Sequence, residues 1–147
     1  MRRWVKDEAA LQKRHGRNPK NVFLWDAHRS GGAESMQVQR LMAPGTEIVP
    51  CRTAKAWPLI VPDGGGLPRL MPMGDEGFNV KGELVQVIPS AFAYFDRYFG
   101  VSDGLHVRLV LWVEVIDRYG DPGERIEAWT WFSMYQVPGT AVLETKP

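Results

Sequence analysis

A carboxylate and an imidazole stand two positions apart in the chain, at Asp26 and His28, directly after the apolar run Val22–Trp25. A carboxylate can orient a nearby imidazole while the ring takes up or releases a proton, so this pair predicts a general acid/base. The alternative interpretation is a plain polar loop or a different contact with a ligand. Either way, the loop after the apolar run is the first place to expect chemistry.

The other reactive residue types form no catalytic or metal-binding motif. Cys51 is the single cysteine and makes no internal disulfide, so we expect a small buried side chain rather than a nucleophile. His15 and His106 have no partners at metal-ligand spacing, and neither H-E-x-x-H nor a Ser/His/Asp order occurs. Gly64-Gly65-Gly66 lacks the Lys-Ser/Thr of a phosphate loop and predicts a hairpin tip. We therefore expect no metal.

Length and composition limit the class of protein. The 147 residues, 44% hydrophobic and 24% charged, fit one globular domain. Since there is no long apolar run and no signal sequence, we expect a soluble, cytoplasmic protein without a membrane partner. A formal charge of +1 does not favour a nucleic-acid partner.

The charge is nevertheless uneven. Residues 1–20 hold seven basic and two acidic side chains, a net +5 that leaves −4 for residues 21–147. Residues 2–15 are predicted to be a short basic helix and residues 16–20 a linker, so the chain divides into an arm, 1–20, and a single domain, 21–147. The arm is either a solvated face or a contact to nucleic acid or a membrane surface. Salt-sensitive binding that is lost on removing the arm would indicate the second.

Apolar spacing and the positions of Gly and Pro predict the remaining elements. Val22–Trp25 is typical of a strand buried on both faces. Pro89 and Gly100 bound a helix whose inner face carries Phe92, Phe95 and Phe99. We further predict a helix at 33–42, strands or loops at 47–52, 57–61 and 67–71, a strand at 79–88, and a hairpin formed by 106–116 and 125–134.

The order of these elements indicates an α+β fold with a curved, mostly antiparallel sheet that tends toward a barrel. Prolines place the segments at 47–52, 57–61 and 67–71 at sheet edges or in loops. Four tryptophans on predicted strands are expected in the core rather than on a ligand platform: Trp57, Trp112, Trp129 and Trp131.

Five segments, in colinear order, resemble motifs of one enzyme family. Val22–Gly32 resembles V-F-V-Y-G-T-L-x-x-G, Arg52–Ile60 resembles T-x-x-x-Y-P-L-V, Val80–Val87 resembles V-x-G-E-L-Y-x-V, Phe95–Gly100 resembles L-D-x-x-E-G, and Ile126–Trp131 resembles V-x-A-W-x-Y. From about Val22 to Phe132 the chain is thus similar to the gamma-glutamylcyclotransferase-like family, and within it to the gamma-glutamylamine cyclotransferase branch.

The resemblance implies a small mixed β-barrel with flanking short helices and a cavity for a γ-glutamyl group. In family enzymes the substrate's own α-amine attacks its γ-carbonyl and releases an amine and 5-oxoproline, without a cofactor. Backbone N–H groups of the Y-G-T-L loop hold the glutamyl group, and the glutamate of L-D-x-x-E-G transfers the proton, which contributes about 10²–10⁴ in rate. The corresponding ligand-binding positions are Leu24, Trp25, Asp26, Ala27, His28 and Phe99.

Two of these positions depart from the family. Phe99 stands where the catalytic glutamate is expected and cannot transfer a proton. Asp26 stands where glycine is expected, and its carboxylate opposes a substrate carboxylate at 4 Å by about 1 kcal/mol in water and about 4 kcal/mol at a dielectric constant of about 20. Glu83 and Asp96 match family positions that are not catalytic, so we expect structural roles, and Glu127 is expected to face outward.

Two functions follow. The first is a cyclotransferase fold that has lost its chemistry and binds a small molecule in the old cavity, or a protein partner. The alternative is an active cyclotransferase whose acid/base has moved to Asp26 and His28. The alternative loses support if Trp25 and Phe99 close the cavity.

Overall fold

The computed structural model describes residues 20–64, 68–71, 77–134 and 139–141. The predicted arm therefore lies, apart from Lys20, outside the described residues, as do Gly65 and Gly66. The described elements are β1 (Asn21–Leu24), the 3₁₀ helix η1 (Asp26–His28), α2 (Ser35–Leu41), β2 (Val49–Thr53), β3 (Leu59–Pro62), β4 (Arg69–Leu70), β5 (Lys81–Gln86), α3 (Ala91–Tyr98), β6 (His106–Ile116), β7 (Pro122–Ser133) and β8 (Gly139–Ala141).

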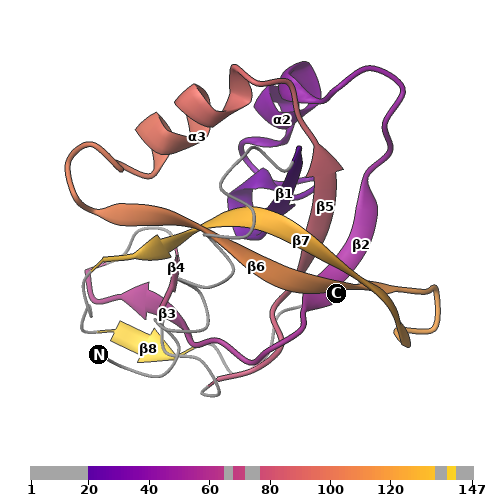
Figure 1. Ribbon diagram of the computed structural model, residues 1–147. Coiled ribbons are helices and arrows are strands. Elements are labelled where there is room, and N and C mark those ends of the chain that lie inside the picture. Colours follow the sequence, from indigo (N-terminus) through magenta and orange to yellow (C-terminus); the bar gives the residue numbers. More distant parts are fainter. Residues whose placement is uncertain (1–19, 65–67, 72–76, 135–138, 142–147) are drawn as a thin grey trace.

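A closed barrel in the strand order β1-β5-β2-β6-β7 forms the centre of the fold (Figure 1). Its neighbouring strands pair antiparallel, except that β1 and β7 run parallel where Val22 lies opposite Trp129. This single parallel pairing closes the barrel and makes it mixed. The predicted α+β barrel with flanking short helices is confirmed.

The start of the barrel depends on a close approach between β1 and β5. Val22, Phe23 and Leu24 are almost fully buried, as expected for a strand covered on both faces. Gly82 on β5 lies so near that a Cβ there would overlap the Leu24 carbonyl oxygen and the Phe23 ring. Only glycine fits at that crossing without displacing the backbone.

Both helices lie at one end of the barrel (Figure 1). Helix α3 begins at Ala91, shortly after Pro89, and ends at Tyr98. Gly100 follows with a φ of 67°, a left-handed conformation that glycine adopts easily. Phe95 is its most buried large side chain, whereas Phe92 and Phe99 are half-buried against the core. No described helix has the length and apolar character needed to cross a membrane.

A small second sheet, in the order β4-β3-β8, lies beside the barrel (Figure 1). β3 and β4 form the predicted hairpin. The expectation that residues 57–61 form an edge strand or loop is wrong, because β3 is the central strand of this sheet and pairs with both neighbours. The same expectation for residues 47–52 is wrong, because β2 pairs with both β5 and β6 in the barrel. Pro58 precedes β3 and Pro62 ends it, so neither removes a hydrogen-bond donor from the middle of the ladder.

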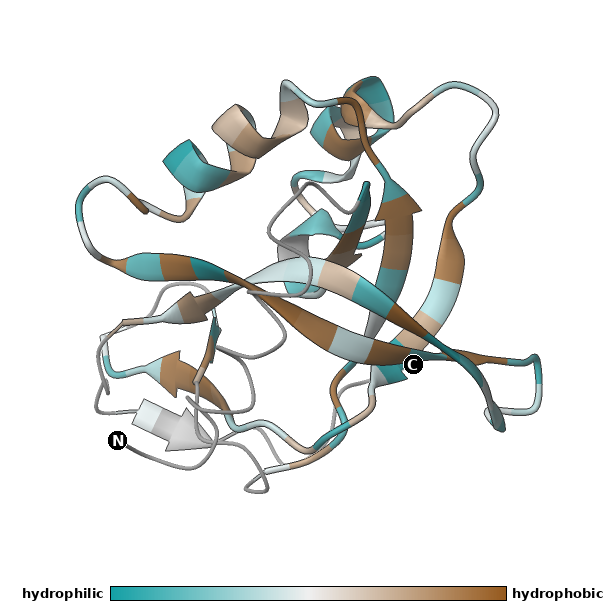
Figure 2. Ribbon diagram, in the orientation of Figure 1, coloured by the Kyte–Doolittle hydropathy of each residue, from teal (hydrophilic) through white to brown (hydrophobic). Residues whose placement is uncertain are grey.

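Hydrophobic residues occur along the barrel strands, while the turn between β6 and β7 is hydrophilic and projects from the barrel (Figure 2). Trp57 and Trp131 are buried in the core as predicted, and Trp129 is half-buried against it. The core prediction is wrong for Trp112, which is 37% exposed. Trp112 and Val113 are neighbours on β6, and alternation along a strand puts only one of the two inside.

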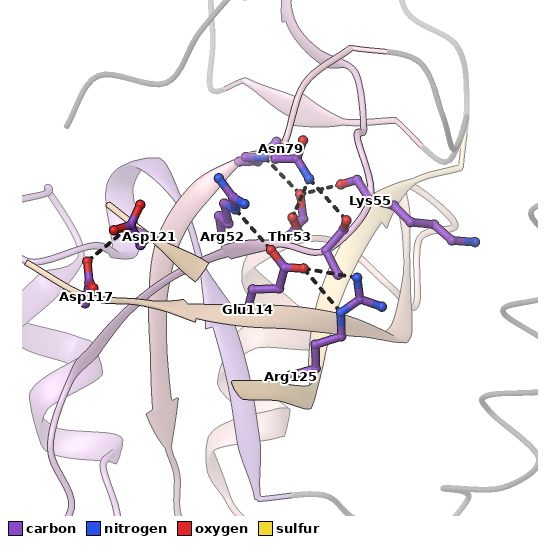
Figure 3. A network of polar contacts seen from close by, with 10 residues as sticks. Arg52, Thr53, Lys55, Asn79, Glu114, Asp117, Asp121 and Arg125 are labelled. Atoms are coloured by element: carbon purple, nitrogen blue, oxygen red, sulfur yellow. Dashed lines mark hydrogen bonds and ion pairs between the residues drawn. The ribbon is translucent and has the colours of Figure 1, made fainter. Parts of the chain in front are cut away.

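An acidic side chain that the sequence patterns did not single out joins three barrel strands. Glu114 on β6 is 8% exposed and accepts from Arg52 on β2 at 3.1 Å and from Arg125 on β7 at 3.1 Å (Figure 3). Thr53 bonds the backbone of Val80 and of Lys55 nearby. The network binds β2, β6 and β7 together on the side of the barrel away from η1.

Candidate functional site

The loop after β1 carries most of the predicted site residues. Leu24, at the end of β1, is in the core, and Trp25 is 3% exposed. Asp26, Ala27 and His28 form η1, and Asp26 has a φ of 54°, the only positive φ of a non-glycine residue in the described chain. The backbone here keeps a conformation in which glycine is unstrained and aspartate costs about 1 kcal/mol.

Phe99 lies between two indole rings. Its ring stacks on Trp25 with centroids 5.4 Å apart and planes 13° apart, and on Trp131 at 5.3 Å and 10°. Each stacked pair contributes about 0.5–1.5 kcal/mol beyond the burial of its surface. The three residues come from the η1 loop, the end of α3 and β7, so the stack fixes these elements to one another.

His28 is 3% exposed and is surrounded by the rings of α3. The ring centroids of Tyr98, Phe95, Phe99 and Tyr94 lie 4.4, 5.3, 5.5 and 6.0 Å from that of His28. Its Nε2 lies 3.2 Å from the Tyr94 hydroxyl, which donates to Glu34 at 3.0 Å. A chain of hydrogen bonds thus runs from Glu34 through Tyr94 to the buried imidazole.

Burial lowers the pKa of His28 to about 4, against a weaker opposing effect of the Glu34 charge. The ring is therefore neutral at pH 7. It can act as a base that accepts a proton, but it is not an imidazolium that could act as an acid. Burial and the Glu34 carboxylate raise the pKa of Tyr94, and burial, Glu34 and Asp26 raise that of Tyr98. Glu34 and Asp26 therefore contribute negative charge near this cluster, while Arg69 contributes positive charge near His106, whose ring packs on Phe99.

The structure separates the two residues that the sequence pattern paired. Asp26 is exposed, and among the described residues the hydrogen-bond partner of His28 is Tyr94. The group that orients the imidazole is therefore the Tyr94 hydroxyl, backed by Glu34, and not the Asp26 carboxylate. No local pattern marks this partner, because Glu34 and Tyr94 lie 60 residues apart in sequence.

One buried donor in the loop has no acceptor in the described part of the chain. The indole nitrogen Nε1 of Trp25 is inaccessible and makes no hydrogen bond there. A buried donor without an acceptor costs about 1–3 kcal/mol. Strain at Asp26, this indole and the buried neutral imidazole of His28 occur within four successive residues, and such features gather at functional sites.

Glu83 and Asp96 have the structural roles expected of them. Glu83 accepts from the Ser30 backbone N–H at 2.6 Å and holds the end of the η1 loop to β5. Asp96 accepts from the Trp131 indole at 2.9 Å and lies 3.6 Å from Arg108. Glu127 is half-buried on β7.

Neither the cysteine nor a metal cluster adds chemistry. Cys51 is buried, as predicted, and burial raises the pKa of its thiol to about 12. Such a thiol carries almost no thiolate at pH 7. Within the described residues, no three His, Cys, Asp or Glu side chains lie close enough to hold a metal ion.

A separate hollow of about 420 Å³ lies at the opposite end of β1, where the strand begins. It is lined by Asn21, Gly45, Thr46, Glu47, Val49, Leu84, Val85, Gln86 and Ile126. It shares no residue with the aromatic cluster around His28.

Comparison with solved structures gives the fold. An AIG2-like protein from Mus musculus superposes with a TM-score of 0.65 at 17% identity, over 82% of this chain and 84% of that one. A protein from Arabidopsis thaliana gives 0.57 at 18% identity, over 77% and 67%. A gamma-glutamyl cyclotransferase gives 0.52 at 16% identity, over 82% and 68%. The chain has the AIG2-like, gamma-glutamyl cyclotransferase fold.

The gamma-glutamyl cyclotransferase fold here has diverged far in sequence. No protein-family model and no curated protein sequence matches the chain. At 16–18% identity the superpositions establish architecture, while the chemistry must be argued from this chain's own residues.

Proposed function

We propose that this protein uses the gamma-glutamyl cyclotransferase fold to bind a small molecule or a protein partner, and that it has lost the cyclotransferase reaction. The observation that carries the proposal is the Phe99 ring, stacked on Trp25 at 5.4 Å and on Trp131 at 5.3 Å. A phenyl ring transfers no proton, and here it is already stacked on two indole rings.

The position of Phe99 supports this reading of the site. By the correspondence of Phe95–Gly100 with L-D-x-x-E-G, we place Phe99 where the gamma-glutamylamine cyclotransferase branch has its catalytic glutamate. Removing a general acid/base costs about 10²–10⁴ in rate. A carboxylate at Asp26 further opposes the α-carboxylate of a γ-glutamyl substrate.

We assign the ligand contacts to the η1 loop and the adjoining end of α3. The proposed ligand-binding residues are Leu24, Trp25, Asp26, Ala27, His28 and Phe99. The unpartnered Trp25 indole and the strained backbone at Asp26 support a binding role for this loop.

The proposal is tested by incubating the protein with γ-glutamyl-amines and γ-glutamyl dipeptides and measuring 5-oxoproline by mass spectrometry. We expect no release above a protein-free control, while an active cyclotransferase in a parallel reaction converts the same substrates. Protein-dependent release of 5-oxoproline would overturn the proposal.

The hydrogen bond between His28 and Tyr94 favours a second candidate, an active gamma-glutamyl(amine) cyclotransferase with a relocated acid/base. In this case His28 is the base, and Asp26 stays a candidate for the second group. Activity would fall at least 100-fold in His28→Gln and in the double variant that adds Asp26→Ala. Unchanged activity in both variants would exclude this candidate.

A further inference from the structure

The proton positions in the chain from Glu34 to His28 follow from counting hydrogens. A tyrosine hydroxyl has one proton, and that of Tyr94 is donated to Glu34 Oε2 at 3.0 Å. The Tyr94 oxygen can then only accept from the imidazole, 3.2 Å away. His28 Nε2 must therefore carry a proton.

A neutral imidazole with a proton on Nε2 has a lone pair on Nδ1. Nδ1 is the ring nitrogen nearer the backbone of His28, which is part of η1. The partner of one ring nitrogen of a histidine thus decides the chemistry of the other.

We propose that Glu34 and Tyr94 are positioning residues: they hold His28 as the Nε2–H tautomer and so make Nδ1 the hydrogen-bond acceptor for a ligand of the η1 loop. A ligand at this loop must then offer an N–H or O–H donor. This inference rests on the proposed function, because it takes the η1 loop as the ligand site.

The surroundings narrow the ligand class. Trp25 Nε1 is a buried donor that lacks an acceptor, so the same ligand is expected to carry one. Aromatic rings enclose His28, while Tyr98 and Phe99 are only half-buried and bring the cluster to the solvent border. Negative charge from Glu34 and Asp26 and positive charge from Arg69 both lie near the cluster, so no excess of positive charge selects an anion. We therefore assign the site to a small neutral molecule that has both a donor and an acceptor, such as an amide.

The tautomer is read from the ¹⁵N resonances of the His28 ring at pH 7, since protonated and bare ring nitrogens have well separated shifts. We expect a single Nε2–H tautomer in the wild type and in Glu34→Gln, which keeps an acceptor for Tyr94. We expect a mixture, or the Nδ1–H form, in Tyr94→Phe. A mixture in the wild type, or an unchanged tautomer in Tyr94→Phe, would overturn the positioning role.

The ligand class is tested by titrating two neutral probes, N-methylacetamide, which has an N–H, and N,N-dimethylacetamide, which has none. Binding is followed by the resonances of the Trp25 indole and of His28. We expect N,N-dimethylacetamide to bind the wild type about tenfold more weakly, because it lacks the N–H of one hydrogen bond. In Tyr94→Phe the two should bind alike. Equal binding in the wild type, or no perturbation by either probe, would overturn the ligand class. Release of 5-oxoproline, measured separately, would instead reject the proposed function.

Discussion

Phe99 and Trp131 stack with ring centroids 5.3 Å apart and planes 10° apart, and the Trp131 indole also donates to Asp96 one turn earlier on α3. Two contacts from one helix thus hold a single tryptophan of β7. The end of α3 is therefore fixed to the barrel through Phe99 and Asp96.

The packing of Phe99 predicts how much a glutamate at position 99 would lower the free energy of unfolding. Phe99→Glu removes both stacks and puts a carboxyl group between two indole rings, so we expect a loss of about 3 kcal/mol in the free energy of unfolding, measured by urea denaturation. The variant should still release no 5-oxoproline. Phe99→Leu keeps an apolar side chain and should lose about half as much. A Phe99→Glu variant as stable as the wild type would contradict the stacked arrangement.

The backbone of Asp26 predicts opposite effects of two substitutions. Asp26→Gly should leave stability unchanged or raise it by up to about 1 kcal/mol, because glycine adopts a φ of 54° without strain. Asp26→Val should lower stability by about 2 kcal/mol, because a β-branched residue is strained there. Thermal unfolding measures both. Asp103 is also exposed but has no positive φ, so Asp103→Val should change stability by less than about 0.5 kcal/mol.

His28 predicts how stability depends on pH. Its pKa falls from 6.5 in the unfolded chain to about 4 in the folded protein, so the unfolded state binds the proton more readily. The neutral ring of His28 therefore makes its full contribution to the free energy of unfolding above pH 6.5. This contribution, about 3 kcal/mol in all, is lost as the pH falls toward 4. Denaturation curves between pH 7 and 4 should show this loss as a slope of the free energy of unfolding against pH, and His28→Gln should remove most of that slope.

The variant His106→Gln is the control for the pH dependence assigned to His28. It is buried, and its Nδ1 lies 2.8 Å from the Phe99 carbonyl oxygen; burial lowers its pKa as well. His106→Gln should reduce the slope but leave the part due to His28. A pH dependence that survives in His28→Gln at full size would contradict the buried neutral imidazole.

Replacing Glu114 is expected to lower the stability of the fold without changing the η1 loop. Glu114→Gln leaves Arg52 and Arg125 side by side without their shared carboxylate, so we expect a loss of about 2 kcal/mol in urea denaturation. Glu124 is exposed on the same hairpin, and Glu124→Gln should change stability by less than about 0.5 kcal/mol. Equal effects of the two variants would mean that the ion pairs of Glu114 contribute nothing.

The barrel leaves no room for a side chain at position 82. Gly82→Ala should cost at least about 3 kcal/mol, because the new methyl group meets the backbone oxygen of Leu24, which cannot move aside like a side chain. Gly123→Ala meets a backbone oxygen only at 3.4 Å and serves as the matched control, with a change below about 1 kcal/mol. Thermal unfolding of the two variants distinguishes the positions.

Local patterns in the sequence predicted the order of the strands and helices from β1 to β7, but among the strands they matched only the bounds of β6 residue for residue. β6 spans His106–Ile116 as expected, and α3 spans Ala91–Tyr98 between its proline and glycine. The differences occur where a turn decides the bounds: β1 ends at Leu24, because Asp26 turns left-handed, and β7 begins at Pro122, because pairing extends into the hairpin. β8 was not predicted, since three residues carry no periodic signal.

The sequence by itself determined which residues form the η1 loop and that position 99 carries a phenyl ring, which cannot transfer a proton, because both depend only on the order of residues along the chain. Only the tertiary structure decided what these residues contact. Tyr94, rather than Asp26, became the partner of His28, and two distant indoles came to enclose Phe99. The physical reason is that strand register and barrel closure bring together groups far apart in sequence, and no local pattern records which of them meet.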